Sequence, residues 1–263
     1  MIYLVFPTSW HPSQPYLSLP SLKAFLNMHG VHDVVQRDLA IELLNDLCTW
    51  EKTKPLYERI IRELNELSSR PRLTQPEAEK FNKLREAEEI VMALKDQIDS
   101  AVASQRSQEF YEIDQYMENL KIMDVWLDNI LAPYYPSQLT VIGSQMRFSP
   151  YSSEEVIDSF NHPEENFFYD LYQQWYLPGI LEEDIDILGI SITSVEQIIS
   201  GLTLAYLVKQ NRPEIHITIG GSVFTKLVDR LEKEGSHLFN FVDSFVVHEG
   251  ETPLLKLVEH LRG

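Results

Sequence analysis

The 263-residue sequence has one cysteine, few basic side chains and no long apolar run, and each scarcity excludes a class of protein. Because Cys48 stands alone, a disulfide framework, a cysteine zinc site and an iron–sulfur cluster held by this chain alone are excluded. The 22 basic residues face 40 acidic ones, and the formal charge of -18 argues against a nucleic acid partner, because its phosphates would be repelled. No apolar run approaches the about 20 residues of a membrane span, and MIYLVF has no basic region before it. We therefore expect a cytoplasmic protein that binds neither nucleic acid nor membrane.

Glycine is missing between Gly30 and Gly143, and this gap separates two ends of alternating pattern from a helical middle. The N-terminal end has the pattern of a buried strand at 2–6, a helix that stops at Gly30 and a second strand at 31–39. The C-terminal end alternates strand patterns at 186–192, 215–221 and within 241–251 with helix patterns at 200–211, 222–235 and 252–261. Strands that alternate with helices of this length form parallel crossover units. We predict an α/β fold with a doubly wound, five-stranded parallel sheet.

The middle of the chain predicts a large, mainly helical insertion after the second strand. We place it at residues 41–179, so that the sheet domain comprises residues 1–40 and 180–263. A packed helical insertion and a coiled-coil dimer arm both fit this segment. Two apolar stripes at helical spacing mark its inner face: Phe81, Leu84, Val91, Leu94, Ile98 and Val102, followed by Ile113, Met117, Leu120, Met123, Leu127 and Ile130.

Residues 151–188 combine acidic and aromatic side chains. They contain ten acidic residues and no lysine or arginine, interleaved with Phe167, Phe168, Tyr169, Tyr172, Trp175 and Tyr176. The helical spacing predicts an aromatic stripe that faces the core of the protein. A face that docks a partner protein is the alternative.

Residues that directly follow the predicted strands are candidates for a binding site, because ligands of doubly wound sheets lie beyond the carboxyl ends of the strands. Small, hydroxyl-bearing and glycine residues dominate there, so a bulky ligand can approach the backbone closely and find hydrogen-bond partners. Each loop alone also fits a structural role: a tight turn at 220–221, helix capping at 191–194, and acidic charge at the start of the last helix for 249–251. The candidate cofactor-binding residues are Thr8, Ser9, Trp10, Ser191, Thr193, Ser194, Gly220, Gly221, Ser222, Glu249, Gly250 and Glu251.

Motifs of other activities on this architecture are missing. The first strand is followed by PTSWHP, which lacks the glycines of a dinucleotide site, and no GxxxxGK string of a phosphate loop occurs. The hydrolase motif GxSxG is also absent, because GIS at 189–191 continues as ITS. The strand ends offer no cluster of three acids for magnesium, and the eight histidines form no pair at metal-ligand spacing on a helix. We therefore assign no catalytic residue and expect no metal site formed by the chain.

Several segments taken together resemble a known family. They are 19–30, the pair Asp38 and Leu39, DILGISIT at 186–193, IGG at 219–221 and VDSFVVHEGETPLLKL at 242–257. These segments resemble the N-terminal cobalamin-binding domain of cobalamin-dependent radical S-adenosylmethionine enzymes, at both ends of the chain and little in the helical middle. The resemblance implies a Rossmann-like fold of the cobalamin-binding type, with cobalamin over the carboxyl edge of the sheet and its nucleotide tail beside the two glycines at 220–221.

The resemblance also implies which residues surround the cofactor. Ser191 and Thr193 would contact the tail or the corrin, and residues 249–252 would close the far side. Many cobalamin proteins place a histidine below cobalt from a DxHxxG loop after the first strand. Here His11 is the one candidate ligand of cobalt, and Ser9 and Gln14 stand where the motif has aspartate and glycine. We therefore expect base-off cobalamin without a protein imidazole.

Radical enzymes of this kind hold an iron–sulfur cluster with a CxxxCxxC motif in a following barrel domain, and this sequence has no such motif. The resemblance thus implies a cobalamin-binding module, with S-adenosylmethionine and the cluster in a missing radical barrel domain or a partner chain. The implied chemistry is methyl transfer or a related radical reaction on a peptide or small molecule. The chain fits a fragment of a larger enzyme or a free-standing cofactor-binding protein, and whether it is an enzyme stays open. A non-catalytic module of the same fold, which binds a small ligand or docks a protein, is the alternative.

Overall fold

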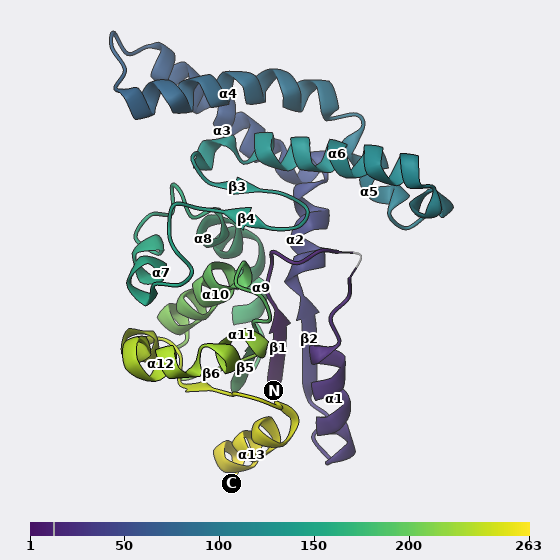
Figure 1. Cartoon of the computed structure of the whole chain (residues 1–263), viewed down its shortest axis with the longest axis vertical. Coiled ribbons are helices and arrows are strands. Elements are labelled where there is room, and N and C mark those ends of the chain that lie inside the picture. Colours follow the sequence, from purple (N-terminus) through teal and green to yellow (C-terminus); the bar gives the residue numbers. More distant parts are fainter. Residues whose placement is uncertain (13) are drawn as a thin grey trace. The chain divides into compact units, whose positions relative to one another are not determined.

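The computed structural model describes residues 1–12 and 14–263 and divides them into two compact units (Figure 1). Unit 1 comprises residues 1–40 and 148–263, and unit 2 comprises residues 41–147. Residues 148–179, which the sequence-based boundary assigns to the insertion, group with the sheet. Within the described residues, no helix is both long enough and apolar enough to cross a membrane.

Unit 1 is built on a five-stranded sheet whose strands are all parallel and follow the order β2-β1-β5-β6-β7. The α/β class and the five parallel strands predicted from the sequence are confirmed, and the arrangement is consistent with a Rossmann-like fold. All five residues of β5 are buried, as expected of an apolar strand covered on both faces. The strands are β1 (Ile2–Phe6), β2 (Val34–Asp38), β5 (Ile187–Ser191), β6 (His216–Gly220) and β7 (Ser244–Phe245).

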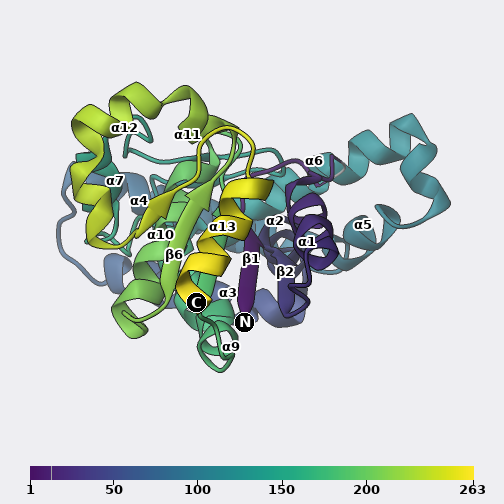
Figure 2. The ribbon, with the colours of Figure 1, turned by 90° about the horizontal axis from the view of Figure 1, so that it is seen from below.

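Helices α1 and α13 cover one face of this sheet. Because side chains alternate along a strand, Ile2, Leu4 and Phe6 point to the same face, where they form a core with Leu26 and Leu254 of the two helices. Figure 2 shows α13 beside α1, and the two helices are in contact. Tyr3, Val5, Leu188, Ile190, Ile217 and Ile219 alternate with these positions and are also buried, on the opposite face.

Helix α10 contacts β5 and packs against α7, α8 and α9. Of the six residues of the predicted aromatic stripe, four are buried in the core, namely Phe167, Phe168, Tyr172 and Tyr176, and the other two, Tyr169 and Trp175, are partly buried. The segment contains a π-helix, η3, where an α-helix was expected. The remaining elements of unit 1 are α1 (Ser18–Met28), α7 (Ser153–Ser159), α8 (Phe167–Leu171), η3 (Tyr172–Tyr176), α9 (Leu177–Leu181), α10 (Gln197–Asn211), α11 (Ser222–Lys226), α12 (Val228–Glu234), η4 (Gly235–Asn240) and α13 (Glu251–Arg262).

Unit 2 is a helical unit with its own core. Helix α4 packs against α3 and α6, and α5 packs against α6. The indole of Trp126 is fully buried and its Nε1 donates a hydrogen bond of 2.7 Å to the carbonyl of Leu47. The elements are α2 (Leu39–Leu47), which begins at the end of unit 1, α3 (Trp50–Ser68), α4 (Gln75–Leu94), α5 (Ile98–Ser104), η1 (Gln108–Tyr111), α6 (Ile113–Ile130), η2 (Ala132–Tyr134), β3 (Gln138–Leu139) and β4 (Ser144–Gln145).

The predicted apolar stripes match the core of unit 2 only in part. Leu84, Val91 and Ile98 are fully buried, as predicted. At the start of α6, however, Ile113 is 77% exposed and Met117 is 59% exposed, so the inner-face prediction is wrong for these two residues. Helical spacing puts these two residues on the same side of α6 as its buried residues. At this end of the helix, however, the neighbouring elements are the short η1 and α5, which do not cover them.

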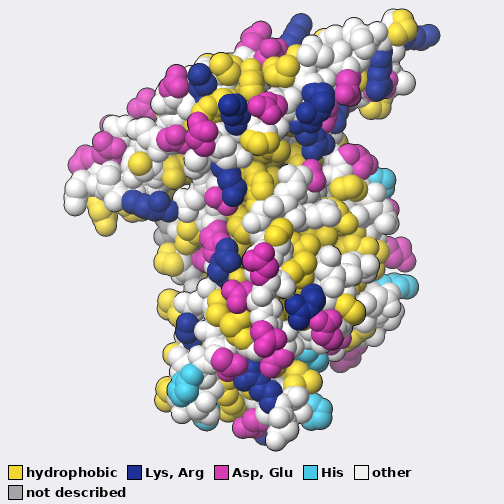
Figure 3. All heavy atoms as spheres, turned by 180° about the vertical axis from the view of Figure 1, so that it is seen from behind, with side chains coloured by type: hydrophobic (Ala, Val, Ile, Leu, Met, Phe, Trp, Pro, Cys, Tyr) yellow, Lys and Arg dark blue, Asp and Glu magenta, His cyan; other side chains and the backbone are white. Residues whose placement is uncertain are grey.

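One face of the molecule carries charged side chains of both signs (Figure 3). On the face shown in Figure 3, lysine and arginine are scattered among aspartate and glutamate, with apolar side chains between them.

Candidate ligand-binding site

A cavity of about 740 Å³ lies at the carboxyl ends of β5 and β6, on the face of the sheet that α1 and α13 cover. Its floor is formed by Leu4, Gly189, Ser191, Thr218 and Gly220. Leu19 and Leu22 line it from α1, Leu254 from α13, and Val246 from the segment after β7; the rim includes Tyr16, Leu17, Ser222, Thr225, Lys226, His248, Glu249, Gly250 and Glu251. The volume falls in the range of about 300–1,000 Å³ typical of small-ligand sites.

The floor is a row of residues from three neighbouring strands. The strand register pairs Leu4 with Gly189 and Gly189 with Thr218, so these residues lie side by side across the sheet. A β-carbon at Gly189 would lie 2.8 Å from Cδ2 of Leu4, which explains the glycine in the middle of this strand. Gly189 of β5 and Thr218 of β6 were not among the predicted candidates, because both lie inside their strands, two residues before the strand ends from which the candidates were taken.

Gly220 and Gly221 have different physical reasons to be glycine. Gly221 has φ +115°, and a β-carbon there would lie 2.0 Å from the carbonyl oxygen of Ile192. The close approach of two chain segments therefore requires Gly221 whether or not a ligand binds. At Gly220 a β-carbon would make only ordinary contacts, 3.7 Å from Val246. The absence of a side chain at Gly220 leaves space in the cavity that the fold alone does not demand.

Hydroxyl groups of the site form hydrogen bonds between different elements. Ser191 at the end of β5 donates a hydrogen bond of 2.9 Å from its Oγ to Oγ of Ser18 at the start of α1, and both residues line the cavity. Ser222 donates from its Oγ to the carbonyl oxygen of Thr193, also at 2.9 Å. These bonds fix the loops after β5 and β6 relative to each other and to α1.

Gln197, a buried residue that the sequence analysis did not single out, positions the loop after β5. Its Oε1 accepts hydrogen bonds from the backbone N of Thr193 at 2.9 Å and of Ser194 at 3.3 Å. Its Nε2 donates to the carbonyl of Pro7 at 2.9 Å and so connects the ends of β1 and β5. Ser194 does not line the cavity, and its Oγ is buried without a hydrogen-bond partner in the part of the chain that the structure describes.

The rim of the cavity carries charges of both signs. Glu249 and Glu251 contribute carboxylates, and Lys226 contributes an ammonium group from α11. His248 has φ 65°, in the left-handed region, and its backbone N donates a hydrogen bond of 2.8 Å to Oγ1 of Thr225. Residues held in this backbone region occur often at functional sites.

The loop after β1 is placed differently from the expectation: Thr8, Ser9, Trp10 and His11 are not among the residues that line the cavity. Thr8 is buried, and its Oγ1 lies 3.0 Å from the hydroxyl of Tyr172. Burial raises the pKa of Tyr172 to about 12, against the opposing effect of its hydrogen bonds. Eight of the twelve candidate residues line the cavity, namely Ser191, Thr193, Gly220, Gly221, Ser222, Glu249, Gly250 and Glu251.

Trp10 and Ser9, in the same loop, are in contact with the protein and not with the cavity. The indole of Trp10 packs edge-on against Phe6 at 5.8 Å and against Tyr16 at 5.4 Å, measured between ring centroids. Tyr16 in turn lines the cavity, so Trp10 supports a wall of the site. Ser9 has φ 71° and is buried.

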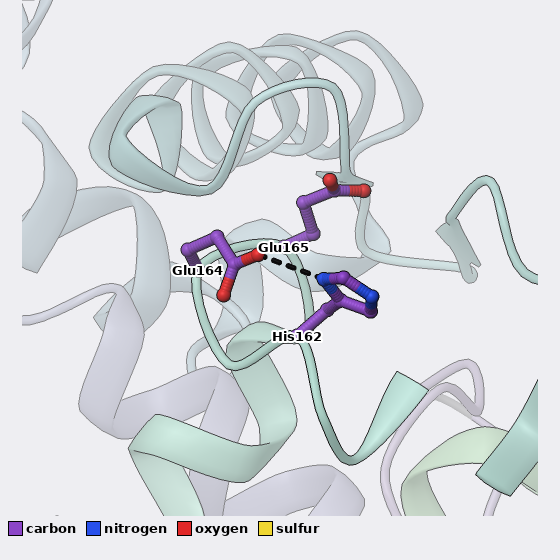
Figure 4. Close-up of side chains that lie close together, drawn as sticks. All are labelled: His162, Glu164 and Glu165. Atoms are coloured by element: carbon purple, nitrogen blue, oxygen red, sulfur yellow. Dashed lines mark hydrogen bonds and ion pairs between the residues drawn. The ribbon is translucent and has the colours of Figure 1, made fainter. Parts of the chain in front are cut away.

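A separate cluster of ionisable side chains lies between α7 and α8 (Figure 4). His162, Glu164 and Glu165 bring one potential ligand atom each to within 4.8 Å of one another. Nδ1 of His162 lies 2.9 Å from Glu164, and its Nε2 lies 3.6 Å from Asp158. Because Asp158 and Glu164 are half exposed and already flank the imidazole, hydrogen bonding between exposed side chains accounts for the arrangement.

Comparisons of the chain with protein-family models, with curated proteins and with solved structures found no match. Apolar walls, a floor of small and hydroxyl-bearing residues, and a rim of mixed charge are suited to binding and orienting a ligand that has an apolar part and a polar part.

Proposed function

We propose that unit 1 binds cobalamin in its base-off form at the carboxyl edge of the sheet, as the cofactor-binding module of a radical S-adenosylmethionine enzyme. The observation that carries the proposal is the cavity between α1 and α13. Eight candidate residues chosen from the sequence for a cobalamin site line this one cavity, although they come from three separate loops.

The shape of the cavity supports binding of the nucleotide tail of the cofactor. The volume of about 740 Å³ is suited to part of a large cofactor, with the remainder outside the mouth. Gly189 and Gly220 let a ligand approach the backbone of the sheet, and Leu4, Leu22 and Leu254 offer apolar contacts to a flat ring. These residues would hold the tail.

The mouth of the cavity supports the same proposal. Tyr16 is 38% exposed and Leu17 is 70% exposed on the rim, so apolar side chains face solvent beside the opening. A large cofactor lying over the mouth would cover them, and hydroxyls and carboxylates of Ser222, Glu249 and Glu251 would meet its polar edge.

Bound cobalamin supplies methyl-group transfer or related radical chemistry, and this chain would bind and orient it. Cleavage of S-adenosylmethionine requires an iron–sulfur cluster held by several cysteine thiolates, and the sequence has one cysteine. The proposal therefore assigns the cluster and S-adenosylmethionine to a radical barrel domain or partner chain, which would also contribute to the binding of a peptide or small-molecule substrate.

The test is retention of cobalamin. The purified protein is incubated anaerobically with hydroxocobalamin, desalted, and examined by ultraviolet–visible spectroscopy beside pH-matched free cofactor. We expect near-stoichiometric corrin absorption of the base-off form. Cobinamide, which lacks the nucleotide tail, is the matched ligand control, and we expect it to be lost on desalting.

Two outcomes would contradict the proposal. A colourless protein after desalting, with circular dichroism of a folded α/β protein, would argue against cobalamin and favour another small ligand or a docking role. Equal retention of cobinamide and cobalamin would place the tail outside the cavity and remove the observation on which the proposal depends.

A further inference from the structure

A chain of three hydrogen-bonding side chains crosses the sheet at the floor of the cavity. His216 and Thr218 lie two residues apart on β6, and the register pairs Thr218 with Ser244 of β7. Nε2 of His216 lies 2.9 Å from Oγ of Ser244, and Ser244 donates from its Oγ to Oγ1 of Thr218, also at 2.9 Å. Thr218 is 3% exposed and lines the cavity.

The direction of these bonds follows from the number of hydrogens available. A serine hydroxyl has one hydrogen, and Ser244 gives it to Thr218. The bond between His216 and Ser244 must then be donated by Nε2–H of the imidazole. Burial lowers the pKa of His216, and the charge of Lys209 acts in the same direction, against Asp243. The neutral imidazole that this favours can carry its hydrogen on Nε2, and the protonated imidazole carries one there as well.

Thr218 is the last member of this hydrogen-bonded series, and the hydrogen of its own hydroxyl group is not used within it. Its oxygen has accepted the hydrogen of Ser244, and within residues 1–12 and 14–263 no acceptor takes the hydrogen of Thr218. A buried donor without an acceptor is unfavourable, and the space beside Thr218 is the cavity. Ser18 on the wall repeats the pattern, because it accepts from Ser191 and keeps its own hydrogen.

We infer that Thr218, oriented by Ser244 and His216, is a hydrogen-bond donor that selects a largely apolar ring bearing an unprotonated nitrogen or another acceptor atom. Thr218 determines specificity, and Ser244 and His216 are positioning residues. The inference deepens the proposed function, since it rests on the cavity being the ligand site and names the chemistry of the group that enters it.

The test compares benzimidazole with indole, two flat bicyclic probes of the same shape that each carry one N–H. Benzimidazole alone has the unprotonated ring nitrogen, so the ratio of the two dissociation constants isolates the acceptor. The dissociation constants are measured at pH 8 by titrating each probe into the protein and following the NMR signals. We expect the wild-type protein to bind benzimidazole about 3- to 10-fold more tightly than indole, which is the effect of one neutral hydrogen bond.

Variants assign this preference to Thr218. Thr218→Val keeps the shape without the hydroxyl and should lose the preference, whereas Thr218→Ser should keep it. Ser244→Ala should weaken it, because the hydroxyl of Thr218 is then free to turn. Thr53→Val is the matched control: Thr53 is a buried threonine of unit 2 that does not line the cavity, and its hydroxyl donates to the carbonyl of Thr49 at 2.8 Å, so the preference should not change.

The inference is overturned if wild-type protein binds indole as tightly as benzimidazole, if neither probe binds at millimolar concentration, or if Thr218→Val keeps the preference. Its failure is distinguishable from that of the proposed function. A protein that prefers benzimidazole but retains no cobalamin contradicts the proposed function alone. A protein that retains cobalamin but does not distinguish the probes contradicts this inference alone.

Discussion

Two neighbouring glycines are expected to respond in opposite ways to substitution, and the contrast separates ligand binding from folding. Gly220→Leu should leave unit 1 folded and fill the cavity, because the position has an ordinary backbone conformation and a β-carbon would lie 3.7 Å from Val246. Along β6, Gly220 shares the face of Thr218, so the leucine side chain would point into the cavity. Gly221→Ala should instead destabilise the fold.

The magnitudes follow from the geometry. At Gly221, φ +115° costs an alanine about 1–3 kcal/mol, and relief of the 2.0 Å approach to Ile192 costs about 1–3 kcal/mol more. The total of about 2–6 kcal/mol is a large part of the about 5–15 kcal/mol that stabilises a typical domain. At Gly220 the same kinds of cost are small, and the free energy of unfolding should stay within about 1 kcal/mol of wild type.

Urea unfolding followed by circular dichroism gives the stability, and hydroxocobalamin retention or benzimidazole binding gives the occupancy of the cavity. We expect Gly220→Leu to lose at least about tenfold in affinity, about 1.4 kcal/mol, at nearly unchanged stability. Gly179→Leu is the control, since Gly179 is exposed with open space beside it. A folded Gly220→Leu protein that binds as wild type does would refute the placement of the ligand, and a Gly221→Ala protein as stable as wild type would refute the backbone argument.

Three further predictions concern stability and reactivity. Burial raises the pKa of Asp186, but hydrogen bonds from Arg262 and the amine of Met1 outweigh this effect and lower the pKa to about 2. Because the folded value lies below the ordinary 3.8, the charged carboxylate stabilises the fold above about pH 4, and this contribution to the free energy of unfolding is lost as the pH falls towards 2. Arg262→Gln should therefore cost about 1 kcal/mol at neutral pH for this partly exposed pair and flatten the acid limb of the urea stability profile; an unchanged acid limb would show that other groups dominate it. Tyr172→Phe should cost about 1 kcal/mol in the same assay, because it removes the bond to buried Thr8, and a neutral effect would contradict that bond. Burial, with the charges of Asp124 and Asp99, raises the pKa of Cys48, so its thiol should react with a disulfide reagent only after unfolding; rapid reaction of the native protein would contradict its burial.

The sequence predicts the sheet well because its strands are continuous apolar runs separated by helical patterns. All five runs became strands of one parallel sheet, at positions that differ by a few residues at the ends. The last strand is the shortest, Ser244–Phe245, within the predicted 241–251. Its polar flanks, Asp243 and His248, left its extent undefined in the sequence.

The site is only partly predictable, because loops meet according to the path of the chain between strands. The loops after β5, β6 and β7 share one cavity, but Thr8 turns away from it and bonds to Tyr172, more than 160 residues later in the sequence. Nothing local to PTSWHP indicates that partner. Likewise, Gln197 lies at the start of the mostly apolar helix α10. Its hydrogen bonds with Pro7, after β1, and with Thr193, after β5, join segments that are far apart in the sequence, so local sequence does not predict them.

The way α1 and α13 are held explains why a cavity persists between them. The two helices share a core that contains Leu19 and Leu26 of α1 and Leu254 and Val258 of α13. At the end of α13, Arg262 binds Asp33, just before β2, at 2.8 Å and Asp186, just before β5, at 2.8 Å. The end of α13 is thus held near the amino ends of the strands, whereas Ser18 of α1 and Glu251 of α13 line the cavity at the carboxyl ends. Because these contacts hold α13 in place without a ligand, we expect the cavity to be largely preorganised, so that a ligand need not supply the free energy to open it.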